Sequence, residues 1–138
     1  MIKMIKTKGY PIMSYYGDPA GSNVQGQSGA GDMEIFRRSG IRIISARDRM
    51  SRNLVASIAY TRGFFESADG IRRVHVDRKC KDLIEDFEEY RYPESEDGKP
   101  IKEEPLKDGT HDHGNDAFRY FIINRFPMRN NEMKRIQR

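Results

Sequence analysis

Two acidic motifs near the two ends of the chain carry the residue types that could do chemistry. They are YGDPAG at residues 16–21 and HDHGNDAFRY at residues 111–120. Asp18 follows an apolar run and Asp116 lies inside a predicted helix, so each carboxylate is carried by a regular backbone element. If the fold brings Asp18 and Asp116 together, they form a hard-oxygen site for Mg²⁺ or Mn²⁺. The expected chemistry is then metal-assisted cleavage of a phosphodiester.

Other residues of the second motif are candidates for supporting roles. Asp112 lies four residues before Asp116 and shares its helix face, so it either approaches the same metal or caps the helix. His113 is expected to support Asp116 from outside the metal-ligand shell, because an isolated His-x-His with one cysteine is a weak zinc site. Arg119 either pairs with a carboxylate or contacts a phosphate. The structural alternatives are a turn role for Asp18 in Asp-Pro and a solvent-facing helix position for Asp116.

The first acidic motif is expected at the end of a strand. Residues 11–16 form a short apolar and aromatic run that predicts a buried strand closed by Gly17. Asp18 then lies at the carboxyl end, where open α/β sheets bind their ligands. Five glycines between residues 17 and 31 predict a flexible loop. This loop lacks the lysine and Ser/Thr of a P-loop, so we expect it to contact DNA or to move rather than to bind a nucleotide.

The remaining pattern alternates strands and helices. Alternating elements of this kind imply an α/β fold with a partly parallel sheet flanked by helices. We expect Asp32 to cap the first of these helices, Asp77 to cap the helix that follows the third strand, Cys80 to be buried, and Ala117 to let the last helix approach the sheet. A short hairpin is possible in the polar stretch 91–108. The predicted elements are a helix at 32–39, a strand at 41–45, a helix from Asp48 to Phe65, a strand at 71–77, a helix through Cys80 and Phe87, and a last helix opened by Thr110 or Asp112.

Length and composition limit the possible functions. With 138 residues there is room for one domain and a modest core, so a motor and a nuclease cannot both fit. The mean hydropathy of −0.84 predicts long polar loops around that core. The single cysteine, Cys80, excludes an intramolecular disulfide and indicates a reducing compartment. No apolar run approaches the roughly 20 residues that a membrane span needs, so we expect no membrane partner.

Basic residues are concentrated in patches. The net charge is +4, from 25 basic and 21 acidic residues, with a pI near 9.2. The patches lie at residues 37–42, 47–52, 72–73 and 125–138. Such patches suit a phosphate backbone, although basic residues can also simply solvate helix faces. The candidate DNA-binding residues are Arg47, Arg49, Arg52 and Arg119.

Three segments together resemble a known family. GDPAG at 17–21, HVDRKCKDLIEDFEEYRY at 75–92 and DHGNDAFRY at 112–120 resemble the C-terminal nuclease domain of the large terminase subunit of tailed phages. The resemblance runs from about Tyr10 to Phe126 and implies a ribonuclease-H-like fold. It also implies a two-metal endonuclease that uses Mg²⁺ or Mn²⁺ to cleave concatemeric double-stranded viral DNA during genome packaging. By this resemblance, Asp18 and Asp116 are catalytic metal ligands.

One departure from the family affects the expected activity. The family takes its first metal-binding aspartate from an earlier strand, whereas residues 1–9 contain no carboxylate. The chain therefore resembles an N-terminally incomplete nuclease domain at residues 1–127, followed by a basic tail at residues 128–138. We expect it to bind metal weakly and to cleave slowly or not at all, unless a separate upstream fragment supplies the missing strand.

The resemblance also implies partners and a location. The expected partners are double-stranded DNA and the upstream ATPase and nuclease portion of the terminase, since no G-x-x-x-x-G-K-[ST] motif occurs here. The portal protein and the small terminase subunit are further candidates. The expected location is the cytoplasm of the infected bacterial host. Two alternatives stay open: a non-catalytic module that guides DNA or docks to the portal, and a resolvase or transposase relative of the same fold.

Overall fold

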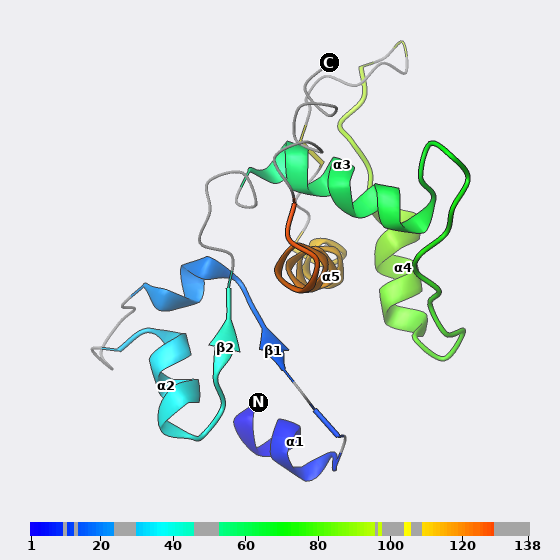
Figure 1. Ribbon diagram of the computed structural model, residues 1–138. Helices are drawn as coiled ribbons and strands as arrows, with labels where there is room; N and C mark the ends of the chain where they lie inside the picture. The colour runs from blue at the N-terminus through cyan, green and yellow to red at the C-terminus, as the bar shows by residue number, and fades with distance from the viewer. Residues whose placement is uncertain are drawn as a thin grey trace.

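The computed structural model describes residues 1–9, 11–12, 14–23, 30–45, 53–95, 97, 104–105 and 109–128. Helices dominate these residues, and two very short strands make up the described sheet (Figure 1). Within the described ranges, no helix is long and apolar enough to cross a membrane. The elements in chain order are α1 (Ile2–Thr7), β1 (Tyr15–Tyr16), the 3₁₀ helix η1 (Pro19–Ser22), α2 (Asp32–Arg38), β2 (Ile43–Ile44), α3 (Leu54–Phe65), α4 (Lys81–Glu89) and α5 (Asp112–Arg125).

The sheet pairs β1 and β2 in parallel. Tyr15 lies opposite Ile43 and Tyr16 opposite Ile44, and the pairing continues as Gly17 N donates to the carbonyl of Ile44 at 3.1 Å. A side chain at Gly17 would crowd β2, because a Cβ there would lie 2.9 Å from Ile43 Cγ2. The strands predicted at 11–16 and 41–45 are therefore present and parallel, but each is reduced to two residues.

The helix predicted at 32–39 is α2, although Asp32 does not cap it. Gly31 holds the N-cap position, and Asp32 instead places a negative charge in the first turn, where the helix dipole favours it. Gly31 has no room for a side chain, since a Cβ there would lie 2.7 Å from the carbonyl oxygen of Ser22. Gly40, predicted to stop the helix, has a φ of +80°, a conformation that glycine adopts readily.

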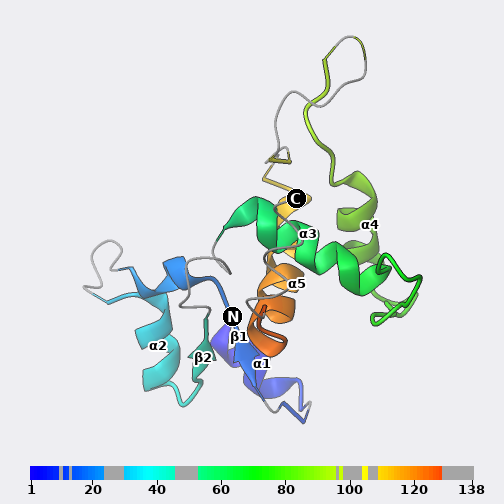
Figure 2. The same cartoon turned by 45° about the horizontal axis from the view of Figure 1, so that its top comes forward.

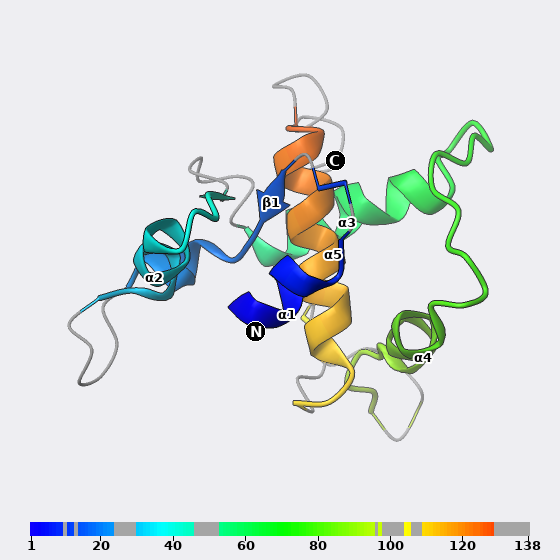
Figure 3. The same cartoon turned by 90° about the horizontal axis from the view of Figure 1, so that it is seen from below.

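Helix α5 is the centre of the described structure. It contacts β1 on one side and both α3 and α4 on the other (Figures 2 and 3). Ile122 and Ile123 of α5 are 0% and 2% exposed, and Ile58 of α3 is also buried. Phe65, Phe87 and Phe118, one from each of the three helices, have ring centroids 5.1 to 5.4 Å apart. The core is therefore mainly helical, and the small sheet packs against one face of α5.

The strand predicted at residues 71–77 is absent, so that prediction is wrong. The backbone here turns back onto the end of α3: the amides of Arg73 and Val74 both donate to the carbonyl of Phe64, at 2.9 and 3.1 Å. Ser67 N likewise donates to the carbonyl of Ile71. These local bonds use backbone groups that a sheet ladder would need, so the alternation of side chains did not produce a strand.

Two expectations for the α4 region are also wrong. Asp77 does not cap α4, because its Oδ1 accepts from Lys79 N at 2.9 Å and the helix begins only at Lys81. Cys80 holds the N-cap position and is exposed rather than buried. The apolar side of α4 is instead turned toward α5, its main described neighbour.

The described chain is thus mostly helical with a small parallel sheet packed on helices. The start of the helix predicted from Asp48 lies outside the described residues, and α3 begins at Leu54 with Asn53 as its cap. The Asn53 side chain accepts from Ala56 N at 2.9 Å, as expected for an N-cap asparagine. Most of the hairpin considered for residues 91–108 also falls outside the described ranges.

Candidate functional site

Strand β1 brings the first acidic motif to α5. Tyr16 packs edge-on against Phe121, with 5.8 Å between the ring centroids. Asp18 follows two residues later and opens η1, where its Oδ1 accepts from Ala20 N at 2.8 Å. The turn role considered for Asp18 is therefore present, and it uses one carboxylate oxygen. The Asp18 side chain remains exposed.

Tyr120 on α5 lies close enough to Asp18 for the two groups to interact electrostatically. Partial burial raises the pKa of Tyr120, the Arg119 charge lowers it, and the nearby Asp18 carboxylate raises it further. Asp116 lies four residues before Tyr120, one turn along the same helix face. Asp18 therefore lies near Tyr120, which is one helical turn from Asp116 along α5.

Asp116 forms a partly buried ion pair with Arg119. The guanidinium donates to Asp116 Oδ1 from Nη2 at 2.8 Å and from Nε at 3.3 Å. Its Nη1 donates to Ser57 Oγ of α3 at 3.0 Å. The side chain of Arg119 is 7% exposed and that of Asp116 23%. Of the two roles considered for Arg119, pairing with a carboxylate describes its position in this structure.

The ion pair leaves one oxygen of Asp116 available. Both bonds from Arg119 fall on Oδ1, and no hydrogen bond to Oδ2 occurs among the described residues. Burial lowers the pKa of Arg119, but the hydrogen bond and charge of Asp116, together with the contributions of Tyr120, outweigh it and raise the pKa overall, so the guanidinium stays charged. Arg119 therefore fixes the direction of a carboxylate that retains an acceptor oxygen.

Asp112 contributes a buried oxygen with no partner. The residue is 8% exposed, and its Oδ1 makes no hydrogen bond within the described chain. An uncompensated buried carboxylate oxygen is costly, so such atoms commonly mark a place for a cation or water. Asp112 is the first residue of α5 and lies on the same face as Asp116, as its spacing predicted.

Tyr90, at the end of α4, lies close enough to both acids for their charges to act on it. Burial raises the pKa of Tyr90 to about 12, and the charges of Asp116 and Asp112 contribute to the rise while Arg119 opposes it. The hydroxyl therefore keeps its proton across the physiological range and can donate a hydrogen bond. Tyr90 was not singled out from the sequence because nothing in its local pattern distinguishes it from the other tyrosines.

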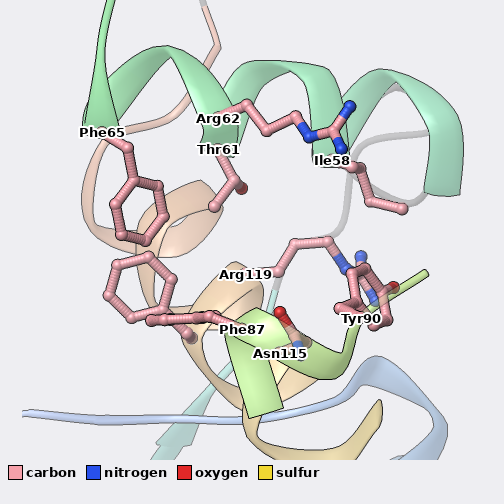
Figure 4. Close-up of a pocket in the computed structure, with 9 residues that line it drawn as sticks. Ile58, Thr61, Arg62, Phe65, Phe87, Tyr90, Asn115 and Arg119 are labelled. Atoms are coloured by element: carbon pink, nitrogen blue, oxygen red, sulfur yellow. The ribbon is translucent and has the colours of Figure 1, made fainter. Parts of the chain in front are cut away.

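A pocket of about 280 Å³ lies between α3, α4 and α5 beside these residues. Figure 4 shows Phe65 and Phe87 at one end of the pocket and Arg119 with Tyr90 at the other. Asn115 lines it from α5, and its amide nitrogen donates to the carbonyls of Asp86 and His111 at 2.6 and 2.9 Å. The Asp86 carboxylate in turn accepts from Gly114 N at 3.1 Å, which fixes the start of α5 against α4.

Gly114, rather than Ala117, allows close helix packing. Ala117 is exposed, so its expected role against the sheet is wrong. A Cβ at Gly114 would instead collide with Asp86 Oδ2 and approach Leu83 Cδ1 at 3.3 Å. The small residue that permits close packing of α5 is therefore Gly114, and it lies against α4 rather than against the sheet.

The other predicted site residues are not joined to this cluster. His113 is exposed, and no hydrogen bond from it to Asp116 occurs within the described chain. Arg47, Arg49 and Arg52 lie outside the described residues. Among the residues that the structure describes, no three His, Cys, Asp or Glu side chains are grouped closely enough to hold a metal ion. Ser57 accepts a hydrogen bond from Arg119. It could not have been identified as the partner of Arg119 from sequence, because the two residues are 62 positions apart.

Searches against protein-family models, curated proteins and solved structures gave no match to this chain.

Proposed function

We propose that this chain is part of a metal-dependent endonuclease of the terminase type, with a ribonuclease-H-like fold of which it forms a portion. Its substrate would be double-stranded DNA during viral genome packaging, with the ATPase on another polypeptide or segment. The supporting observation is the placement of Asp18, Asp112 and Asp116 around α5. The family resemblance of the motifs that carry these acids supports the same proposal.

The residues present fit a divalent cation in part. Asp112 Oδ1 is a buried carboxylate oxygen without a hydrogen-bond partner, and Asp116 Oδ2 is free of Arg119. Carboxylate oxygens of this kind are preferred ligands of Mg²⁺ and Mn²⁺. When bound, divalent cations activate the attacking water and stabilise the leaving oxygen of the phosphodiester. A further acid from outside these residues would complete the site.

The chain's own residues would position the carboxylates. Arg119, itself held by Ser57, orients Asp116 through Oδ1, which is the role of an outer-shell partner at many metal sites. Tyr90 stays protonated beside Asp116 and Asp112 and can donate to an anionic oxygen. Asp18 lies near the same helix, close enough to Tyr120 for its charge to raise the Tyr120 pKa.

A second candidate function is a non-catalytic DNA-guiding or portal-docking module. It is favoured by the ion pair of Asp116 with Arg119, which already occupies one oxygen of that carboxylate. In this reading the acids are structural, and the chain would bind DNA or a packaging partner without binding metal specifically.

Paramagnetic broadening by Mn²⁺ separates the two functions. In the nuclease reading, titration of the labelled chain with Mn²⁺ broadens the amide resonances of Asp18, Asp116 and their neighbours together. Asp18→Asn should weaken this effect at Asp116, because both side chains would act on one cation. Asp77→Asn, which removes an exposed carboxylate from a loop, serves as the control and should change nothing. Broadening spread evenly over exposed acids, and equal in both variants, would favour the non-catalytic module.

A further inference from the structure

A second surface of the molecule combines aromatic rings with arginines. A hollow of about 630 Å³ lies between the C-terminal ends of α3 and α5. Three aromatic residues and two arginines line this hollow, and we name the surface that they form the aromatic–arginine face. They are Tyr60, Phe64, Phe126, Arg73 and Arg125. Residues 127–128 complete the lining.

The rings of this face are held in a fixed arrangement. The Phe64 ring lies 5.3 Å from that of Phe126 and 5.4 Å from that of Tyr60. The Tyr60 hydroxyl donates to the carbonyl oxygen of Phe126 at 3.1 Å and so anchors the end of α5 to α3. Phe126 nevertheless remains 40% exposed. Its ring is thus packed against Phe64 and Phe121 and is only partly covered.

The charges of this face are of one sign. Among the residues that the structure describes, no Asp or Glu lines the hollow, and neither Arg73 nor Arg125 has an ion-pair partner. Arg125 lies over the Phe126 ring at 5.2 Å, and Arg73 donates weakly to the carbonyl of Gly63 at 3.4 Å. The pKa of Asp69 is lowered mainly by the hydrogen bond that its carboxylate accepts from the Ser67 hydroxyl, and the charge of Arg73 makes a smaller contribution. Both guanidinium groups therefore retain donors for an external anion.

We propose that the aromatic–arginine face binds single-stranded nucleic acid. A partly exposed ring beside two arginines that have no ion-pair partner within the described chain matches the requirements of single-strand binding, in which unpaired bases stack on aromatic side chains and the backbone phosphates contact cations. In a duplex the base faces are already stacked on one another, so an exposed phenyl ring would gain nothing. The ten residues that follow, 129–138, add four basic residues and one acidic residue in sequence.

This site is independent of the proposed nuclease chemistry. It includes neither acidic motif and needs no divalent cation, so its test is run in the presence of a chelator. Loss of metal binding at Asp18 and Asp116 would leave it unchanged, and failure of single-strand binding would leave the nuclease proposal standing.

The test is fluorescence anisotropy with a labelled oligothymidylate of about 12 nucleotides, a length within the site sizes of single-strand binders. Phe126→Leu keeps apolar bulk against Phe64 but removes the ring face, and should weaken binding about tenfold, since stacking contributes on the order of 1–3 kcal/mol per base. Phe126→Trp should restore or strengthen binding. Circular dichroism and thermal melting of each variant confirm that the fold is retained.

The arginines are tested by salt dependence. Arg73→Gln with Arg125→Gln should lower the slope of log affinity against log salt by about 1.4, because each phosphate of a single strand that an arginine no longer neutralises lowers it by about 0.7. Arg37→Gln with Arg38→Gln removes two exposed arginines of α2 and is the charge control; it should leave both affinity and slope near the parent values.

Three results would overturn the proposal. The first is unchanged affinity in Phe126→Leu. The second is binding of a matched duplex as tightly as the single strand, with the same response to every variant. The third is competition by oligoglutamate as effective as by unlabelled oligothymidylate, which would assign the face to acidic peptides.

Discussion

Asp116→Ala is expected to cost about 3 kcal/mol of folding free energy, because it leaves the Arg119 guanidinium buried without its counter-ion. Removing one partner of a buried pair typically costs about 3–5 kcal/mol, and we take the lower end since Asp116 is 23% exposed. Urea denaturation of parent and variant measures the difference, with the slope checked for constancy.

Two comparisons isolate the ion pair. Replacing both partners, as Asp116→Leu with Arg119→Met, should recover much of the loss, because a hydrophobic pair of similar volume carries no unpaired charge. Glu34→Ala breaks a similar acid–arginine arrangement on the exposed surface of α2 and should have a much smaller effect. Equal losses in Asp116→Ala and Glu34→Ala would mean that the Arg119 pair is not buried as described.

Ile122→Ala is expected to have the largest effect of any core truncation in α5. Its side chain is 0% exposed at the point where α5 passes between the sheet and α3. Truncation of a fully buried isoleucine to alanine costs about 2–5 kcal/mol, from lost burial and the cavity that remains. For a domain with a typical stability of about 5–15 kcal/mol, this loss should lower the urea midpoint clearly.

Ile71→Ala is the matched control for this prediction. Ile71 is 49% exposed and lies in the loop after α3, so the same chemical change should alter stability by about 0.5 kcal/mol or less. If the two isoleucine variants unfold at the same urea concentration, then α5 does not form the core of the molecule.

Sequence reasoning succeeded where periodicity and local chemistry agree. The last helix was predicted with Asp112 as one of its two possible first residues, because its apolar positions recur at helical spacing. The pairing of Asp116 with Arg119 was also one of the two roles weighed, since residues three apart on a helix are neighbours. The strands around Tyr16 and Ile44 were located correctly because short apolar runs bounded by glycine are typical of strands. The burial expected of the first strand was wrong, since Tyr15 and Tyr16 are only half-buried and Ile12 is exposed.

The failures have physical causes that lie outside local patterns. Residues 71–77 alternate like a strand, but their amides bond to the end of α3. Cys80 was placed on a buried face by spacing alone, whereas α4 begins one residue later and leaves it exposed. The partner of Arg119 on α3, Ser57, and the position of Tyr90 beside the acids depend on tertiary packing. A single sequence carries no local signal for such contacts.

The central claim is that β1 brings Asp18 to α5, beside Tyr120. Nuclear Overhauser contacts in the labelled chain measure this directly. The structure predicts cross-peaks between the ring protons of Tyr16 and Phe121, whose centroids are 5.8 Å apart, and between the β protons of Asp18 and the ring of Tyr120. A spectrum in which Tyr16 and Asp18 show contacts only within residues 1–45, and none to α5, would contradict the account.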